Sequence, residues 1–433
     1  MADEQLVLNN DLAEKLYINA LPLLVSEMVH RDYPADYIKH DRFYPTNETA
    51  KFGKPNRDTL YSAGFLQLAD TPYLLEIPKI EDRYFLFPFF SAYGDVINSL
   101  GTKSGKFGKY FLIQNGKKKP DGYDDYETIT FRESLIGYLM RIETKGEDDY
   151  KNVHNIQDSI KLTPLYKERL RKNEYKPENI DPVIYAKSLP DKEFYELYGR
   201  LLKDNPALDN QVYDILALLD YDADNGILNY DNLTDVQKNI LNEGRKSGIE
   251  KLSLNDISNL KYKYDGKWLA ILGGMGEYGN DYIGRARVMG SPGGWGANVP
   301  SECVYYNADT DNNKKILSTE KNYKIHFKKG GLPHAGAFWS LAVYGGDTGD
   351  VTDTENGIYS LNSNDLNLGI LKTNPDGSLD IYIGPDKPDE YFINNWIESK
   401  YPNDNRISIN IRVYIPDEIT KEGLWETPDI IEI

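Results

Sequence analysis

The sequence predicts a mainly β protein with two antiparallel β-sandwich domains, the C-terminal one jelly-roll-like, and a small all-α domain between them. In residues 61–142, and again from about residue 302, apolar residues alternate with polar ones in short segments separated by Gly, Pro, Asn and Asp. Between about 155 and 262 the apolar residues instead recur every three or four positions. The first pattern is typical of strands and the second of amphipathic helices.

These changes of period divide the chain into three expected domains. Residues 1–154 hold an N-terminal helix and the first β-sandwich, residues 155–265 hold the helical domain, and residues 266–433 hold a Gly-rich linker and the second sandwich. A single hydrophobic core stops growing beyond about 250–300 residues, so a chain of 433 residues is expected to divide in this way.

In the N-terminal part, residues 9–32 carry apolar side chains at i, i+4 spacing, which predicts an amphipathic helix that packs on the first sheet. The strands expected in the first sandwich lie at 73–77, 84–90, 110–114 and 135–142. Because the segment 84–90 is almost continuously apolar, we expect that strand to be buried on both faces.

In the middle of the chain, helices are expected at 194–202 and 212–219. A third helix is expected to begin at Thr234, because Thr234 and Gln237 have the spacing of a capping box. The second sandwich is expected to contain strands at 323–328, 337–344, 379–383 and 409–415.

Composition excludes several classes of protein. The chain has 50 Lys and Arg against 68 Asp and Glu, and its net charge of −18 opposes binding to nucleic acid. No segment approaches the ~20 apolar residues that a membrane span requires. The first residues lack the basic start and apolar run of an export signal, so we expect a cytoplasmic protein.

The motifs of common catalytic and cofactor sites are missing or incomplete. A single cysteine, Cys303, rules out a disulfide framework and a thiolate zinc site, and we expect it to be a small buried residue. Residues 274–279 match G-x-G-x-x-G, but Gly284 and Gly290 are expected to break the helix that a dinucleotide site needs next. We interpret this segment as a linker and expect no cofactor.

One acidic loop is similar to a calcium-binding loop. Positions one, three, five and twelve of this loop are Asp220, Asp222, Asp224 and Asp231. A calcium loop also needs Gly at position six and a bidentate Glu at position twelve, and this loop has Asn225 and Asp at those places. We therefore expect a solvated acidic turn, with calcium as the weaker alternative and no other metal site.

The most polar stretch at the start of a predicted sheet is residues 56–62, Asn-Arg-Asp-Thr-Leu-Tyr-Ser. Polar groups that gather where a core begins must satisfy one another or hold a ligand. One interpretation is a buried polar cluster in which Asp58 accepts hydrogen bonds from Arg57, Thr59 and backbone amides. The other is the floor of a binding or catalytic site.

Two functional hypotheses follow from this sequence. The leading one is a non-catalytic binding or assembly protein, because 34 Tyr against 14 Phe provide flat contact area with terminal hydroxyls. Its expected partners are further copies of the chain, in a homo-oligomer, and a glycan or small polar ligand.

The alternative is a hydrolase or lyase that acts on a carbohydrate or small polar substrate in a cleft between domains. In this hypothesis Asp58 and Asp95 act as acid and base. The arginines would hold anionic or hydroxylated groups and the aromatic residues would stack on the substrate. The expected binding residues are Asn56, Arg57, Tyr61, Arg285, Trp339 and Trp396.

The sequence also resembles a known pair of domains. The segments 56–62, 76–78 and 82–84, with Asp95, Gly101 and Arg141, are similar to the N-terminal domain of unknown function 1254. The segments 279–282, 285–286, 338–340, 376–378, 395–396 and 412–416 are similar to its companion, domain of unknown function 1214. The resemblance implies two β-sandwich domains, the second jelly-roll-like, around a small helical domain, and it implies no established reaction. The family also occurs in large DNA viruses, and the Lys-, Asn-, Asp- and Tyr-rich composition suits a viral protein.

Overall fold

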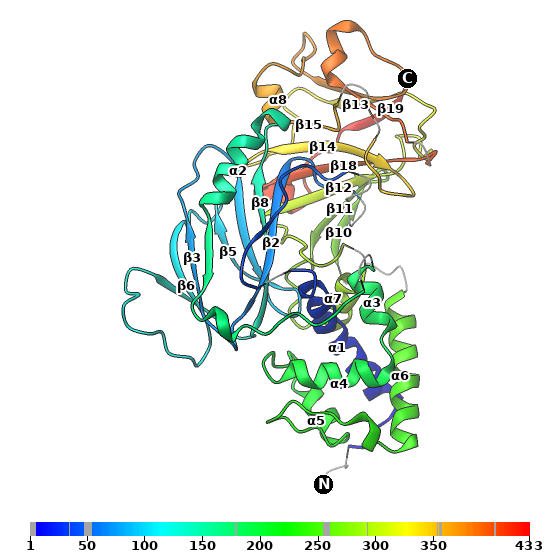
Figure 1. Cartoon of the computed structure of the whole chain (residues 1–433). Coiled ribbons are helices and arrows are strands. Elements are labelled where there is room, and N and C mark those ends of the chain that lie inside the picture. The colour runs from blue at the N-terminus through cyan, green and yellow to red at the C-terminus, as the bar shows by residue number, and fades with distance from the viewer. Residues whose placement is uncertain are drawn as a thin grey trace.

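Figure 1 shows the computed structural model of the chain, which describes residues 6–33, 35–46, 54–177, 180–253, 260–291, 293–352, 354, 357–401 and 404–433. In these residues the protein is mainly β, with four sheets and several helices. Two sheets come from the N-terminal part and two from the C-terminal part, and most of the helices gather below them in this view. No helix in the described ranges is long and apolar enough to cross a membrane.

Two sheets, A and B, form the N-terminal β region. In hydrogen-bonded order, sheet A contains β1 (Lys39–His40), β2 (Thr59–Gln67), β8 (Leu135–Glu143), β4 (Phe85–Phe90) and β5 (Val96–Gly101). Sheet B contains β7 (Glu127–Phe131), β6 (Gly108–Gln114), β3 (Tyr73–Ile77) and β9 (Lys161–Pro164). The sheets share one hydrophobic core, to which Tyr73 of β3, Phe87 of β4 and Val153 of α2 (Tyr150–Ser159) belong. Every residue of β4 is buried, as its apolar sequence predicts.

The helix α1 (Asn10–His30) lies at the centre of a helical group, dark blue among green helices in Figure 1. It contacts α3 (Pro182–Ser188), α4 (Asp191–Leu202), α5 (Gln211–Ala217), α6 (Asp235–Ser253) and α7 (Tyr282–Met289). The helix also packs on the first sheet, as expected, because Phe65 and Phe90 of sheet A join its core, but most of its neighbours are helices. The helix α6 approaches α1 closely at Gly244, where a Cβ would lie 2.4 Å from Ala13 Cβ.

Two helix starts show how local sequence shapes this region. The capping box before α6 is present, since Gln237 N donates to Thr234 Oγ1 at 3.3 Å and Thr234 N donates to Gln237 Oε1 at 2.9 Å. A helix also follows the Gly-rich segment, contrary to expectation, because Asp281 caps α7 by accepting from Gly284 N at 2.9 Å. The preceding strand β11 (Trp268–Gly273) pairs antiparallel with both of its neighbours, so this segment is not part of a βαβ unit.

Two further sheets form the C-terminal region. Sheet C contains β10 (Lys261–Tyr264), β11 (Trp268–Gly273), β12 (Cys303–Ala308), β18 (Ile407–Tyr414), β14 (Trp339–Gly345) and β15 (Ser360–Asn362). Sheet D contains β17 (Trp396–Glu398), β16 (Leu379–Gly384), β13 (Tyr323–Phe327) and β19 (Asp429–Glu432). Alternate residues of both sheets, among them Ile325, Ile381 and Ile411, fill one hydrophobic core. Two short helices, α8 (Ser363–Asn367) and α9 (Glu418–Lys421), and 3-10 turns at Glu147–Asp149, Lys167–Arg169, Tyr230–Asn232 and Glu390–Asn395 complete the described elements.

Some details of the sheets differ from the expected pattern. The pairs β6–β7 and β16–β17 are parallel, whereas the sequence predicts only antiparallel sheets. Each pair is joined by a connection of about a dozen residues, which is long enough for the crossover that a parallel pair needs. The strands β9 and β10 both lie in the range expected to be helical, but β9 pairs with β3 and β10 pairs with β11.

Sheet A and sheet C meet through their outer faces. A small apolar cluster joins them, with Tyr84 and Leu86 of the N-terminal part and Cys303, Phe338 and Tyr414 of the C-terminal part. The rings of Phe338 and Tyr414 stack with their centroids 4.2 Å apart. Polar side chains surround this cluster, and the predicted site residues before β2 lie among them.

Candidate functional site

Asp58, directly before β2, is buried between sheet A and sheet C with 2% of its surface exposed. Its Oδ2 accepts a hydrogen bond from Ser340 Oγ at 2.6 Å, and its Oδ1 accepts one from Ser360 Oγ at 3.1 Å. Arg412 Nη1 lies 4.0 Å from Asp58 Oδ2. Burial raises the pKa of Asp58, while Arg412 and the two serine hydroxyls oppose that rise. The carboxylate therefore joins the N-terminal sheet to three strands of sheet C.

The expected pairing of Asp58 with Arg57 is wrong. Arg57 Nη1 donates to the Pro45 carbonyl at 3.1 Å. Its guanidinium lies 3.6 Å from the centroid of the Tyr359 ring and 5.0 Å from that of Tyr44. Successive residues in extended chain point to opposite sides, so Arg57 and Asp58 diverge even though they are neighbours.

Asn56 organises the backbone at this point. Its Oδ1 accepts hydrogen bonds from Asp58 N at 2.7 Å and Thr59 N at 3.1 Å. Its Nδ2 donates to Tyr414 Oη at 2.7 Å, on the far side of the contact between the sheets. All these interactions are internal, so Asn56 positions Asp58 and links sheet A to sheet C.

Asp95 and Arg285, both predicted site residues, form an ion pair elsewhere in the molecule. Arg285 Nη2 lies 3.2 Å from Oδ1 and 3.1 Å from Oδ2 of Asp95. Tyr278 N donates to Asp95 Oδ1 at 3.0 Å, and Arg285 Nη2 also donates to the Gly279 carbonyl at 2.8 Å. The pair therefore fastens the Gly-rich segment before α7 to the start of β5.

The structure does not bring Asp58 and Asp95 together. Asp58 comes directly before β2 and lies close to the level of Phe85, the first residue of β4. Asp95 comes directly before Val96, which pairs with Phe90, the last residue of β4. The two carboxylates are therefore at opposite ends of sheet A. At ~3.3 Å per residue, these two levels of the sheet are about 16 Å apart along β4. Carboxylates that cleave one glycosidic bond lie roughly 5–9.5 Å apart. These two side chains are not placed to act as acid and base on one bond.

Arg141 of β8, one of the residues that resemble domain of unknown function 1254, is a buried cation. It is 4% exposed, and its Nη2 donates to the Gly296 carbonyl at 2.7 Å. Burial lowers the pKa of Arg141, but neighbouring tyrosines, first Tyr61 and then Tyr305, outweigh burial and raise it. The Tyr61 ring lies with its centroid 5.4 Å from the Arg141 guanidinium. Tyr61, expected to stack on a ligand, thus stacks on Arg141.

The two predicted stacking tryptophans are both core residues. Trp339 of β14 is 3% exposed and packs on Phe327, with ring centroids 5.7 Å apart. Trp396 of β17 is 2% exposed, and its indole Nε1 donates to the Gly384 carbonyl at 3.0 Å. Neither ring presents a face to solvent.

The acidic loop does not gather its carboxylates. Asp222 accepts from Asn225 N at 3.1 Å and from Asn225 Nδ2 at 2.8 Å. Asp231, expected at position twelve, instead forms an ion pair with Lys192 of α4. Across the residues whose placement the structure describes, no three metal-binding side chains come together, and that includes Asp220 and Asp224.

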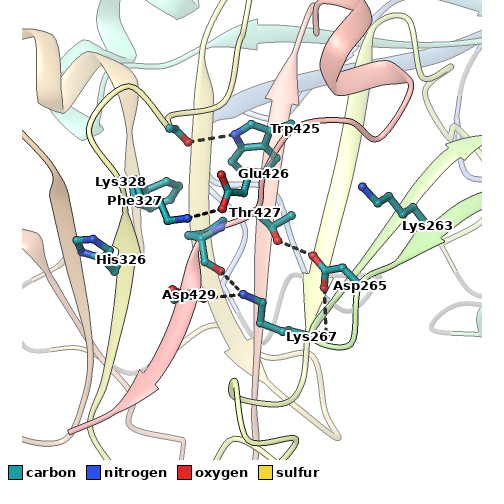
Figure 2. A pocket seen from close by; sticks show the side chains of 12 residues that line it. Lys263, Asp265, Lys267, His326, Phe327, Lys328, Trp425, Glu426, Thr427 and Asp429 are labelled. Carbon is teal, nitrogen blue, oxygen red and sulfur yellow. Dashed lines mark hydrogen bonds and ion pairs between the residues drawn. The ribbon is translucent and has the colours of Figure 1, made fainter.

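A hollow that we name the edge hollow lies where β10 and β11 of sheet C approach β13 and β19 of sheet D. Its volume is about 300 Å³. Figure 2 shows cations and carboxylates paired with one another along its lining. Thr427 Oγ1 donates to Asp265 Oδ2 at 2.5 Å, and Lys267 Nζ lies 2.9 Å from Asp429 Oδ1. On the opposite wall Lys328 forms an ion pair with Glu426.

His326 of β13 is also part of the lining of the edge hollow. Its Nδ1 lies 2.6 Å from Oδ1 of Asp380, a residue of β16 that is 6% exposed. The register explains this contact, since His326 pairs directly with Asp380 on one side and with Asp429 on the other. The sequence identifies His326 as part of a strand, and only strand pairing reveals its contact with Asp380.

Two sequence families match the chain, each described as protein of unknown function. DUF1254 matches residues 36–164 and DUF1214 matches residues 302–418, so the resemblance seen in the sequence is confirmed. No curated protein matches.

Two crystal structures are similar to this one. That of the VPA0106 protein from Vibrio parahaemolyticus has 20% sequence identity and a TM-score of 0.68, with 98% of this chain and 100% of that chain covered. That of an uncharacterized protein from Burkholderia cenocepacia has 12% identity and a TM-score of 0.44, with 97% and 88% covered. The likeness to the Vibrio protein shows a shared fold.

Proposed function

The chain belongs to the family that joins domain of unknown function 1254 to domain of unknown function 1214, and on this premise we propose that it is a binding protein rather than an enzyme. Its proposed ligand is a small hydroxylated molecule, such as a terminal sugar of a glycan, bound in the edge hollow. The observation that carries this proposal is the lining of the edge hollow, which combines lysines and carboxylates with the aromatic residues Phe327 and Trp425.

A sugar suits this lining because each hydroxyl both donates and accepts hydrogen bonds. One wall supplies donors and acceptors from Lys267 and Asp265, and the other supplies them from Lys328 and Glu426. The volume of about 300 Å³ lies at the lower end of the range for ligand sites, which favours one sugar ring over a long chain. The jelly-roll-like architecture expected for the C-terminal part supports the same proposal, because lectin domains often have it.

The geometry of sheet A favours binding over the hydrolase or lyase alternative. That alternative assigned acid and base roles to Asp58 and Asp95, which lie at opposite ends of sheet A. Asp58 is enclosed by Ser340, Ser360 and Arg412, and it is not among the residues that line the edge hollow. Its interactions support a structural role.

A glycan array, followed by calorimetric titration with the best-binding monosaccharide, tests the proposal. Lys328→Met is expected to weaken binding at least tenfold, because it removes a donor from the edge hollow. Lys321→Met is the matched control, since Lys321 is also a partly exposed lysine near β13 that pairs with a glutamate, Glu432. If no sugar binds at millimolar concentration, or if both variants bind as the parent does, the proposal is wrong.

Self-association is the second candidate function, and β10 favours it. This strand is at the edge of sheet C, and its Tyr262 and Tyr264 are 46% and 58% exposed. An edge strand offers unpaired backbone groups to a second copy of the chain, although Lys261 and Lys263 weaken that tendency. Light scattering is expected to find a homo-oligomer, as a virion-associated protein would form, and Tyr262→Ser with Tyr264→Ser is expected to yield a monomer. A monomeric parent protein at tens of micromolar would exclude this candidate.

A further inference from the structure

A second hollow, which we name the junction hollow, lies between β5 of sheet A and the segment that leads into β12 of sheet C. Its volume is about 310 Å³. Because β5 is an edge strand, one wall of this hollow is a strand that has no further strand beside it. The opposite wall carries Val299, Ser301 and Glu302. The junction hollow is separate from the edge hollow and shares no residue with it.

Glu302 brings an unusual carboxyl group to the junction hollow. Its side chain is 6% exposed, and its Oε1 lies 3.7 Å from Lys103 Nζ. Its Oε2 is buried and makes no hydrogen bond of good geometry among the residues that the structure describes, although the Tyr84 hydroxyl lies close enough to lower the pKa of Glu302. Burial raises the pKa of Glu302 more than Lys103 lowers it. Glu302 is among the residues that line the junction hollow, so its carboxylate can accept a hydrogen bond from a ligand bound there.

Lys103 supplies the opposite charge at the mouth of the same hollow. Its Nζ donates to Ser301 Oγ at 2.6 Å, and its side chain is 36% exposed. An ammonium group has three donors, so the bond to Ser301 leaves donors for a ligand. The separation of 3.7 Å from Glu302 Oε1 is longer than a direct charged hydrogen bond, so each of the two charges retains capacity for another partner.

We propose that the junction hollow binds a small zwitterion of the α-amino acid class. The ligand's ammonium group binds Glu302 and its carboxylate binds Lys103, so each end of the ligand meets an opposite charge. Asn98 and Ser99 of β5 border the hollow and provide further polar contacts. Val96 and Val299 provide an apolar wall for an aliphatic side chain. The lining carries Lys103 together with two carboxylates, Glu277 and Glu302. An anion alone would be repelled by the carboxylates and a cation alone would leave Lys103 without a partner, whereas a molecule with both charges can pair with both kinds of group.

Three ligands that differ by one charge at a time test the proposal on the full chain. L-leucine carries both charges, N-acetyl-L-leucine lacks the ammonium group, and L-leucinamide lacks the carboxylate. Titration calorimetry is expected to show binding of L-leucine and at least tenfold weaker binding of each analogue. If L-leucine gives no binding at millimolar concentration, or if either analogue binds as tightly as L-leucine, the proposal is overturned.

Two variants assign the charges to residues. Lys103→Met is expected to weaken the binding of L-leucine at least tenfold and to leave the affinity for L-leucinamide unchanged. L-leucinamide has no carboxylate, so it does not depend on Lys103. Glu302→Gln is expected to weaken the binding of L-leucine and to leave the affinity for N-acetyl-L-leucine unchanged, because that analogue lacks the ammonium group that Glu302 binds. Lys79→Met and Glu81→Gln are matched controls on an exposed ion pair of the same region, with side chains 71% and 72% exposed. An equal loss of affinity for all three ligands in either variant would contradict the proposed orientation. If a variant fails to fold, the comparison of the three ligands on the parent protein still decides the proposal.

Discussion

Arg412 Nη1 lies 4.0 Å from Asp58 Oδ2 across the contact between sheet C and sheet A. Both side chains are nearly enclosed, with 6% of the Arg412 side chain and 1% of the Asp58 side chain exposed. Arg412 Nη1 has no hydrogen-bond partner among the described residues, and Nη2 donates to the Lys54 carbonyl at 3.2 Å. Asp58 is therefore the carboxylate that compensates the Arg412 charge in a region of low dielectric.

Removing this carboxylate is expected to destabilise the protein. Asp58→Ala leaves Arg412 buried without its counter-charge and removes the acceptor of Ser340 and Ser360, so the free energy of unfolding should fall by about 3–5 kcal/mol. Urea unfolding measures this loss. Asp125→Ala is the control, because Asp125 forms an exposed pair with Lys109 and its removal should change little. Melting temperatures of Asp58→Ala within error of the parent would contradict the structural role of Asp58.

The close approach of α1 and α6 gives a second prediction. Replacing Gly by Ala inside a helix usually stabilises it by about 1 kcal/mol. In Gly244→Ala the new Cβ would lie 2.4 Å from Ala13 Cβ and 2.6 Å from Glu14 N, so the two helices must separate. We expect a net destabilisation of about 1–3 kcal/mol, measured by chemical unfolding.

Lys246→Ala in the same helix is the control for this experiment, since the Lys246 side chain is 65% exposed and forms an ion pair with the neighbouring Glu243. It should leave the free energy of unfolding almost unchanged. A Gly244→Ala protein that is more stable than the parent would mean that α1 and α6 do not meet at this distance.

A pH dependence is expected from His40 of β1. Burial, reinforced by Arg42, lowers the pKa of His40 to about 4, and its Nδ1 lies 2.7 Å from Ser62 Oγ. The unfolded chain binds this proton near pH 6.5, whereas the folded chain binds it only near pH 4, so stability falls as pH decreases through that window. Unfolding of the parent and of His40→Gln between pH 7 and pH 4 should show a smaller decrease for the variant. If the free energy of unfolding decreases equally with pH in the parent and in the variant, His40 is not the cause of the pH dependence.

The thiol of Cys303 is expected to be unreactive in the folded protein. Cys303 is buried, and burial raises the pKa of its thiol to about 12. Only the thiolate reacts with alkylating reagents, so iodoacetamide at pH 8 should modify the folded protein far more slowly than the urea-unfolded protein. Mass spectrometry measures both rates. Equal rates would show that the contact between sheet A and sheet C opens readily.

Much of the secondary structure was available from local sequence. The periods of apolar residues predicted α1, the buried strand β4 and the strands β13, β14, β16 and β18 of sheets C and D, because side-chain periodicity records which face is buried. The Thr234 cap was predicted from a spacing of three residues and is present. The helix α7 was missed because its glycines suggested a linker, whereas Asp281 caps it and fixes its first turn.

The sequence alone determined the mainly β character of the chain, the helices of its middle part and the family to which it belongs. For Asp58 it left two interpretations, a buried polar cluster and the floor of a binding site. Only the tertiary structure decided that Arg412 is the counter-charge of Asp58, that Asp95 lies at the other end of sheet A, and that Glu302 and Lys103 share a hollow. The physical reason is that periodicity and capping depend on residues within a few positions of one another, whereas ion pairs and hollows depend on strand order and register, which bring distant segments together.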